Sequence, residues 1–174
     1  MVILMKLKRA FGQKRFVFKR KISPSKRFFQ AFSKEELEKD TDLYSVDFKR
    51  AFAFSAVSLC AYNGEKIKNC LSSCGFTDIR LYNYRDKNGV KPCAFAFGKR
   101  KLSGFTLVMI AVSGTVKKQW YSNFDLGEKK FHRGFYNCCF EIKKNLLKYL
   151  EKEKISEQNV RFFVTGHSRG GAAG

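Results

Sequence analysis

The sequence predicts a mixed α/β fold with a central, mainly parallel sheet and flanking helices. Residues 105–112 and 160–165 are apolar runs typical of strands that helices cover on both faces. Between them, residues 134–152 carry apolar side chains at helical spacing, which predicts an amphipathic helix. Strand, helix and strand in this order favour a right-handed βαβ unit, and a glycine-rich turn follows its second strand.

Three helices are expected before the first strand. Ser33, followed by three glutamates, has the pattern of a helix start. Residues 44–62 fit a mostly buried helix that the following Asn-Gly pair would end. A shorter helix over residues 65–73 should end at Gly75.

The hydrophobic period then changes to alternation, which predicts two neighbouring strands. Residues 76–84 and 94–98 alternate between apolar and polar side chains, and turn residues occupy positions 86–89 between them. A hairpin or meander is therefore expected, and the apolar run at 105–112 should form a central strand.

Charge divides the chain into a basic arm, residues 1–34, and one domain, residues 35–174. The arm holds 11 of the 35 Lys and Arg residues and no Asp or Glu, while the whole chain has a formal net charge of +20. Such a segment would be attracted to an anionic membrane surface or to nucleic acid. A solvated arm is the simpler interpretation, and no specific nucleic acid is predicted as a partner.

The start of the chain does not have the pattern of a secretory signal. Lys6, Lys8 and Arg9 interrupt the apolar residues before a hydrophobic region of sufficient length can form. The longest weakly polar stretch, residues 51–62, is shorter than the roughly 20 residues that span a bilayer. A cytoplasmic location is the resulting expectation.

Six cysteines are present, and reduced thiols are expected in the absence of an export signal. Cys70 and Cys74 are spaced for one helix face, but no histidine or second cysteine pair stands nearby at zinc-site spacing. The sequence therefore predicts no metal site and no cofactor.

The turn Gly166-His167-Ser168-Arg169-Gly170 follows the second buried strand and leads into small residues, which is the context of a nucleophile elbow. A serine held there has an exposed Oγ and a strained backbone, while the flanking glycines let strand and helix approach. Backbone N–H groups and the helix dipole would favour a developing oxyanion. The alternative is a glycine-rich turn with a surface serine.

A second oxyanion donor is expected at the end of the other buried strand, at Ser113-Gly114-Thr115. In parallel α/β sheets, reactive groups gather at the carboxyl ends of neighbouring strands, so Thr115 and Ser168 should lie at the same edge.

Four segments together resemble the class 3 (fungal-type) lipases of the α/β-hydrolase superfamily, in order and in spacing. They span residues 105–174: the oxyanion strand Ala111-Val112-Ser113-Gly114-Thr115, the Trp-x-x-Asn segment Trp120-Tyr121-Ser122-Asn123-Phe124, the His-x-Gly-Phe segment His132-Arg133-Gly134-Phe135, and the elbow at residues 164–172.

The resemblance implies a serine hydrolase that acts on lipid or acyl esters through an acyl-enzyme. Ser168 would be the nucleophile, and the backbone N–H groups of Thr115 and Arg169 would form the oxyanion hole, to which Thr115 could add its hydroxyl. Ser113 departs from the family, which usually has Arg before Gly-Thr.

The acid and the histidine of an α/β-hydrolase triad follow the serine in the chain, and only six residues follow Ser168 here. His167 should point away from its neighbour, and His132 fits a packing role. The sequence is therefore expected to be a partial α/β-hydrolase fold, incomplete at the C-terminus and truncated just after the elbow. It should be inactive or weak by itself.

Two other hypotheses remain from the sequence. One is a noncatalytic binding module that uses the basic, Phe-bearing arm on an anionic surface. The other is cysteine chemistry at Cys138-Cys139 near His132, against which the helical placement favours core packing.

Overall fold

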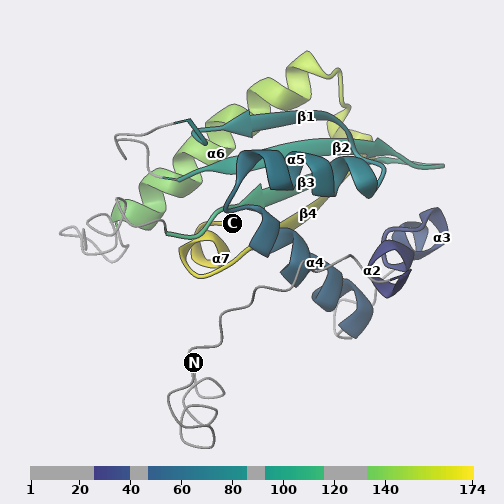
Figure 1. Cartoon of the computed structure of the whole chain (residues 1–174). Coiled ribbons are helices and arrows are strands. Elements are labelled where there is room, and N and C mark those ends of the chain that lie inside the picture. Colours follow the sequence, from purple (N-terminus) through teal and green to yellow (C-terminus); the bar gives the residue numbers. More distant parts are fainter. Residues whose placement is uncertain (1–25, 40–46, 86–92, 116–132) are drawn as a thin grey trace, which may run out of the picture.

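The computed structural model describes residues 26–39, 47–85, 93–115 and 133–174 (Figure 1). The helices are α2 (Lys26–Gln30), α3 (Lys34–Glu38), α4 (Phe48–Cys60), α5 (Gly64–Ser73), α6 (Arg133–Lys152) and α7 (Arg169–Ala173). The strands are β1 (Thr77–Tyr82), β2 (Phe95–Lys101), β3 (Thr106–Val112) and β4 (Val160–Gly166), and a 3₁₀ turn, Glu157–Asn159, precedes β4.

The four strands form one sheet in the order β1-β2-β3-β4. β1 and β2 pair antiparallel, as do β2 and β3, whereas β3 and β4 pair parallel. The predicted hairpin and the parallel βαβ unit are confirmed. The expectation of a mainly parallel sheet is wrong for the described strands. Parallel neighbours need a crossover connection, and among the described elements a crossover helix, α6, joins β3 to β4 and no other pair.

Helices cover the two faces of the sheet, with α4 and α5 on one side and α6 and α7 on the other (Figure 1). Successive side chains of β3 point alternately to these two layers. Leu107, Met109 and Ala111 belong to the core on the α4–α5 side. Val108, Ile110 and Val112 belong to the core on the α6 side. The prediction of a central strand buried on both faces is confirmed.

β4 differs from the prediction of a second buried strand. The side chains of Phe162 and Val164 are 41% and 43% exposed. In the part of the chain that the structure describes, β4 has β3 on one side and no strand on the other. The apolar run of β4 therefore presents apolar surface to solvent.

The helix predicted over residues 44–62 is shorter and less buried than expected. α4 begins after Asp47, whose carboxylate accepts hydrogen bonds from the backbone N–H groups of Lys49 and Arg50. Phe48 and Phe52 are 82% and 59% exposed, so only one face of α4 packs against the core. Residues 44–46 lie outside the described residues.

The predicted starts and ends of the shorter helices agree with the structure. Ser33 caps α3 by accepting a hydrogen bond from the N–H of Glu36. Asn63 caps α5 through the N–H of Lys66. Gly75 follows α5 with a φ of 79°, a left-handed conformation that glycine adopts without a steric cost.

Part of the predicted basic arm packs on the domain. Phe28 and Phe32 are buried among the core residues on the α4 side of the sheet. Residues 1–25 lie outside the described residues, so the boundary at residue 34 stays a prediction. Among the helices that the structure describes, none has the length and apolar character needed to cross a bilayer.

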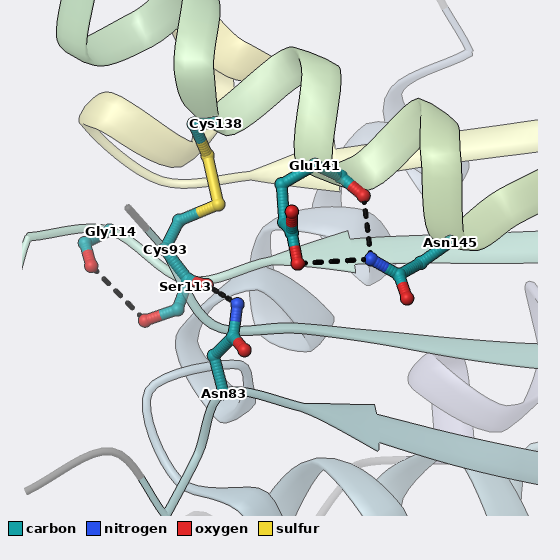
Figure 2. Close-up of a disulfide and its surroundings, with 7 residues drawn as sticks. All are labelled: Asn83, Cys93, Ser113, Gly114, Cys138, Glu141 and Asn145. Atoms are coloured by element: carbon teal, nitrogen blue, oxygen red, sulfur yellow. Dashed lines mark hydrogen bonds between the residues drawn. A yellow bond between two sulfur atoms is a disulfide. The ribbon is translucent and has the colours of Figure 1, made fainter. Parts of the chain in front are cut away.

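A disulfide joins Cys93, just before β2, to Cys138 in α6 (Figure 2). The Cα atoms of the two residues are 5.7 Å apart, which suits a disulfide. The expectation of reduced thiols is therefore wrong for this pair. The hypothesis of cysteine chemistry at Cys138-Cys139 is weakened, because the Cys138 sulfur is part of the disulfide. Disulfides are typical of proteins in oxidising compartments. The cytoplasmic location inferred from the sequence stays a prediction.

Candidate active site

The turn between β4 and α7 has the geometry of a nucleophile elbow. Ser168 has φ 56° and ψ −123°, a strained conformation for a residue with a side chain. Hydrogen bonds from the N–H of Gly170 to the carbonyl of His167 and from the N–H of Gly171 to the carbonyl of Ser168, both 3.0 Å long, begin the helix. Ser168 is exposed at the tip of this turn.

The two elbow glycines leave no space for a side chain. A Cβ atom on Gly166 would collide with the carbonyl carbon of Gly170 and lie 2.8 Å from the backbone nitrogen of Gly171. A Cβ atom on Gly170 would lie 2.5 Å from the carbonyl oxygen of Val112. Strand, turn and helix therefore approach one another as the flanking glycines predicted.

The end of β3 lies beside the elbow. Val112 pairs with Gly166 in the parallel register, and Ser113 and Gly114 follow it. A Cβ atom on Gly114 would lie 2.7 Å from the carbonyl oxygen of His167. Ser113 is buried, and its hydroxyl donates a 3.1 Å hydrogen bond to the carbonyl of Gly114 (Figure 2). The structure thus brings the segment that leads into Thr115 to the same sheet edge as Ser168.

Tyr62, which follows α4, contacts both segments. Its Oη lies 2.8 Å from Nδ1 of His167 in a hydrogen bond. A Cβ atom on Gly114 would overlap the same Oη. Sequence reasoning assigned Tyr62 to the end of a buried helix, because nothing in its local pattern distinguishes a site residue from a core aromatic. Its partner is 105 positions away in the sequence.

The side chain of Arg169 adds a buried positive charge next to the elbow. It is 3% exposed, and this burial lowers the pKa of the guanidinium from its ordinary value. Desolvation raises the pKa of Tyr62, against the opposing effect of the Arg169 charge. The Tyr62 hydroxyl is therefore protonated at neutral pH and acts as a hydrogen-bonding group.

A second hydrogen bond anchors the end of β4 to α4. The hydroxyl of Thr165 donates to the carbonyl of Phe54 over 2.9 Å, and Thr165 is buried. The Phe54 ring packs on Phe163 with its centroid 4.9 Å away. The strand that carries the elbow is thus fixed to the helix that leads into Tyr62.

Several predicted site elements cannot be placed. The segment at residues 120–124 and His132 lie outside the described residues. Among the residues that the structure does describe, the one imidazole is that of His167, which is bonded to Tyr62. No cluster of three or more His, Cys, Asp or Glu suited to a metal ion occurs in these described ranges.

Comparisons with known proteins point to one family. Residues 105–174 match the family model described as lipase (class 3). The secreted mono- and diacylglycerol lipase 1 of Fusarium solani is 30% identical over 74 residues, which cover 37% of this chain and 22% of that protein. The chain therefore spans about a fifth of the length of this curated relative. No solved structure gives a significant match.

Proposed function

We propose, because residues 105–174 match the class 3 lipase family, that this chain carries the nucleophile and the oxyanion hole of a serine ester hydrolase. Its substrates are lipids or other acyl esters, and the chemistry needs no cofactor. The observation that carries the proposal is the strained, exposed Ser168 between β4 and α7, with the end of β3 beside it.

The chemistry uses backbone donors from two strand ends. The Oγ of Ser168 attacks the ester carbonyl carbon, and the carbonyl π electrons move to the oxygen. The N–H groups of Thr115 and Arg169 bind this oxyanion. Water takes the proton of the Ser168 hydroxyl, and collapse of the tetrahedral intermediate breaks the ester C–O bond, so that the leaving alkoxide regains a proton from water and departs as the alcohol. Water then attacks the acyl-enzyme, which gives the carboxylic acid and returns the proton to Ser168.

We also propose that turnover by these 174 residues is slow. A complete triad needs a histidine that takes the serine proton, and the described imidazole of His167 is bonded to Tyr62 instead. With no such base among the described residues, catalysis comes from binding and the oxyanion hole alone, about three orders of magnitude or more below a complete triad. Acylation of Ser168 should therefore be easier to detect than steady-state release of product.

A fluorophosphonate probe tests the nucleophile directly. The Ser168 oxygen bonds to phosphorus, fluoride leaves, and the hydroxyl proton passes to buffer, so intact mass increases by the phosphonyl group. The wild-type chain and the Ser103→Ala control, which removes an exposed hydroxyl far from the elbow in the sequence, should both be labelled. Ser168→Ala should not be labelled. Labelling that persists in Ser168→Ala would contradict the proposal.

A second candidate function is binding to an anionic membrane surface through the basic arm, which is favoured by its charge. The structure sharpens the test, because Phe28 and Phe32 belong to the core and should be kept. Deletion of residues 1–25 should abolish salt-dependent binding to vesicles that contain phosphatidylserine. Unchanged binding after this deletion would remove the candidate.

A further inference from the structure

Tyr62 lies where the two segments of the oxyanion hole meet. Its hydroxyl bonds to the side chain of His167, the residue before Ser168. The same oxygen occupies the space next to Gly114, the residue before Thr115. One hydroxyl group therefore touches the neighbours of both the nucleophile and a backbone donor.

We propose that Tyr62 is a positioning residue that sets the separation between the two backbone donors, the N–H groups of Thr115 and Arg169. This inference rests on the proposed function. Tyr62 does not react. It holds the turn at His167 and the strand end at Gly114 in a single relative position, so that both donors point to the same oxyanion.

The backbone of Tyr62 is itself anchored, which a positioning role requires. Ala61 is fully buried, and its N–H donates to the carbonyl of Val57. The hydroxyl of Tyr84 donates a 2.8 Å hydrogen bond to the carbonyl of Ala61. The end of α4 is thus fixed to the domain independently of the elbow, and Tyr62 extends from this support.

The neutral hydroxyl suits the role better than a charged group would. The side chain is partly desolvated, which raises the pKa of Tyr62 and keeps its proton at neutral pH. Its neighbour Arg169 carries the positive charge next to the elbow. Loss of the hydroxyl would leave that charge in place while releasing His167 and Gly114.

The chain offers a matched control in Tyr149. Both tyrosines have a hydroxyl in a hydrogen bond, but the Tyr149 hydroxyl donates to the carbonyl of Asp78 in β1, over 3.1 Å, rather than to His167. Tyr62→Phe and Tyr149→Phe each keep the ring and remove one oxygen. A general packing defect would follow both substitutions, whereas a positioning defect would follow only Tyr62→Phe.

Labelling kinetics of Ser168 in the full chain give the first test. Fluorophosphonate concentration is varied to separate the maximal rate constant from the half-saturating concentration, and urea unfolding confirms that both variants fold. Tyr62→Phe should lower the maximal rate constant about tenfold with little change in half-saturation, because a small misplacement of reacting groups costs this much. Tyr149→Phe should stay within about twofold of wild type. Equal rates in wild type and Tyr62→Phe, or an equal loss in both variants, would overturn the inference.

Backbone amide NMR spectra provide a test that does not depend on reaction. The amide resonances of Thr115 and Arg169 should shift in Tyr62→Phe and remain in place in Tyr149→Phe. If the wild-type chain is not labelled at Ser168, the proposed function fails, and these spectra alone decide the role of Tyr62. Unshifted amides in Tyr62→Phe would show that the hydroxyl does not position them.

Discussion

Gly170 lies so close to Val112 that a Cβ atom on Gly170 would be 2.5 Å from the Val112 carbonyl oxygen. This contact joins the first turn of α7 to the end of β3. Because the atom in the way belongs to the backbone, no side-chain rotation can relieve the overlap.

Gly170→Ala should therefore destabilise the domain by about 1–3 kcal/mol, the usual cost of overpacking. Urea unfolding at equilibrium measures the change. Gly104→Ala is the matched control, since a Cβ atom on Gly104 would meet no atom within 4 Å. Equal stability of the two alanine variants would contradict the close approach of α7 to β3.

Loss of the Cys93–Cys138 disulfide should lower the free energy of unfolding by about 2–4 kcal/mol, because the crosslink restricts the unfolded chain. The double variant Cys93→Ala with Cys138→Ala tests this by urea unfolding without reductant. Cys139→Ala removes an exposed thiol beside the bond and should change stability little. Maleimide labelling of all six cysteines in the unreduced, unfolded protein would disprove the bond.

Thr165→Val should destabilise the domain by about 0.5–1.5 kcal/mol, since it removes the hydrogen bond from the buried Thr165 to the carbonyl of Phe54 while nearly keeping the side-chain shape. Thermal or urea unfolding measures the loss. An unchanged free energy of unfolding in Thr165→Val would mean that the hydrogen bond from β4 to α4 does not stabilise the domain.

Acid should weaken the ion pair between Glu153 and Lys99, whose charged atoms are 2.7 Å apart. The hydrogen bond from Lys99 holds the pKa of Glu153 below its ordinary value of 4.5. A depressed carboxyl pKa contributes stability at neutral pH that is lost as the pH falls below 4.5 through the folded-state pKa. Urea midpoints between neutral and acidic pH should therefore fall less in Glu153→Gln than in wild type.

The control for this pH dependence is Glu157→Gln, which changes an exposed carboxyl in the 3₁₀ turn before β4. It should keep the wild-type loss of stability in acid. An unchanged pH dependence in Glu153→Gln would show that the pair does not stabilise the fold.

Local sequence patterns predicted β3, α6 and the turn at Ser168 well, because each pattern depends on residues close together in the sequence. A continuous apolar run marks β3, helical periodicity marks α6, and flanking glycines mark the turn. The exposure of β4 was predicted less well. Its apolar run has the pattern of a buried strand, but exposure depends on which strands and helices surround it. For α4, the phenylalanines gave the pattern of a buried helix, and the structure exposes Phe48 and Phe52.

Relationships across long sequence distances were not predictable. Cys93 and Cys138 are 45 positions apart, and Tyr62 and His167 are 105 apart. Pairing in each case depends on how α4, α6 and the sheet pack in space. The roles of Ser168, Thr115 and Arg169 stay predictions until the labelling experiments are done.

The disulfide also determines how the chain responds to a protease. Residues 93–138 form a covalently closed loop that contains β2, β3 and the first part of α6. One peptide-bond cleavage anywhere inside this loop leaves two pieces that remain joined, so the chain runs as a single species until a reductant is added. Two fragments would then separate on reduction, and their sizes would give the position of the cut.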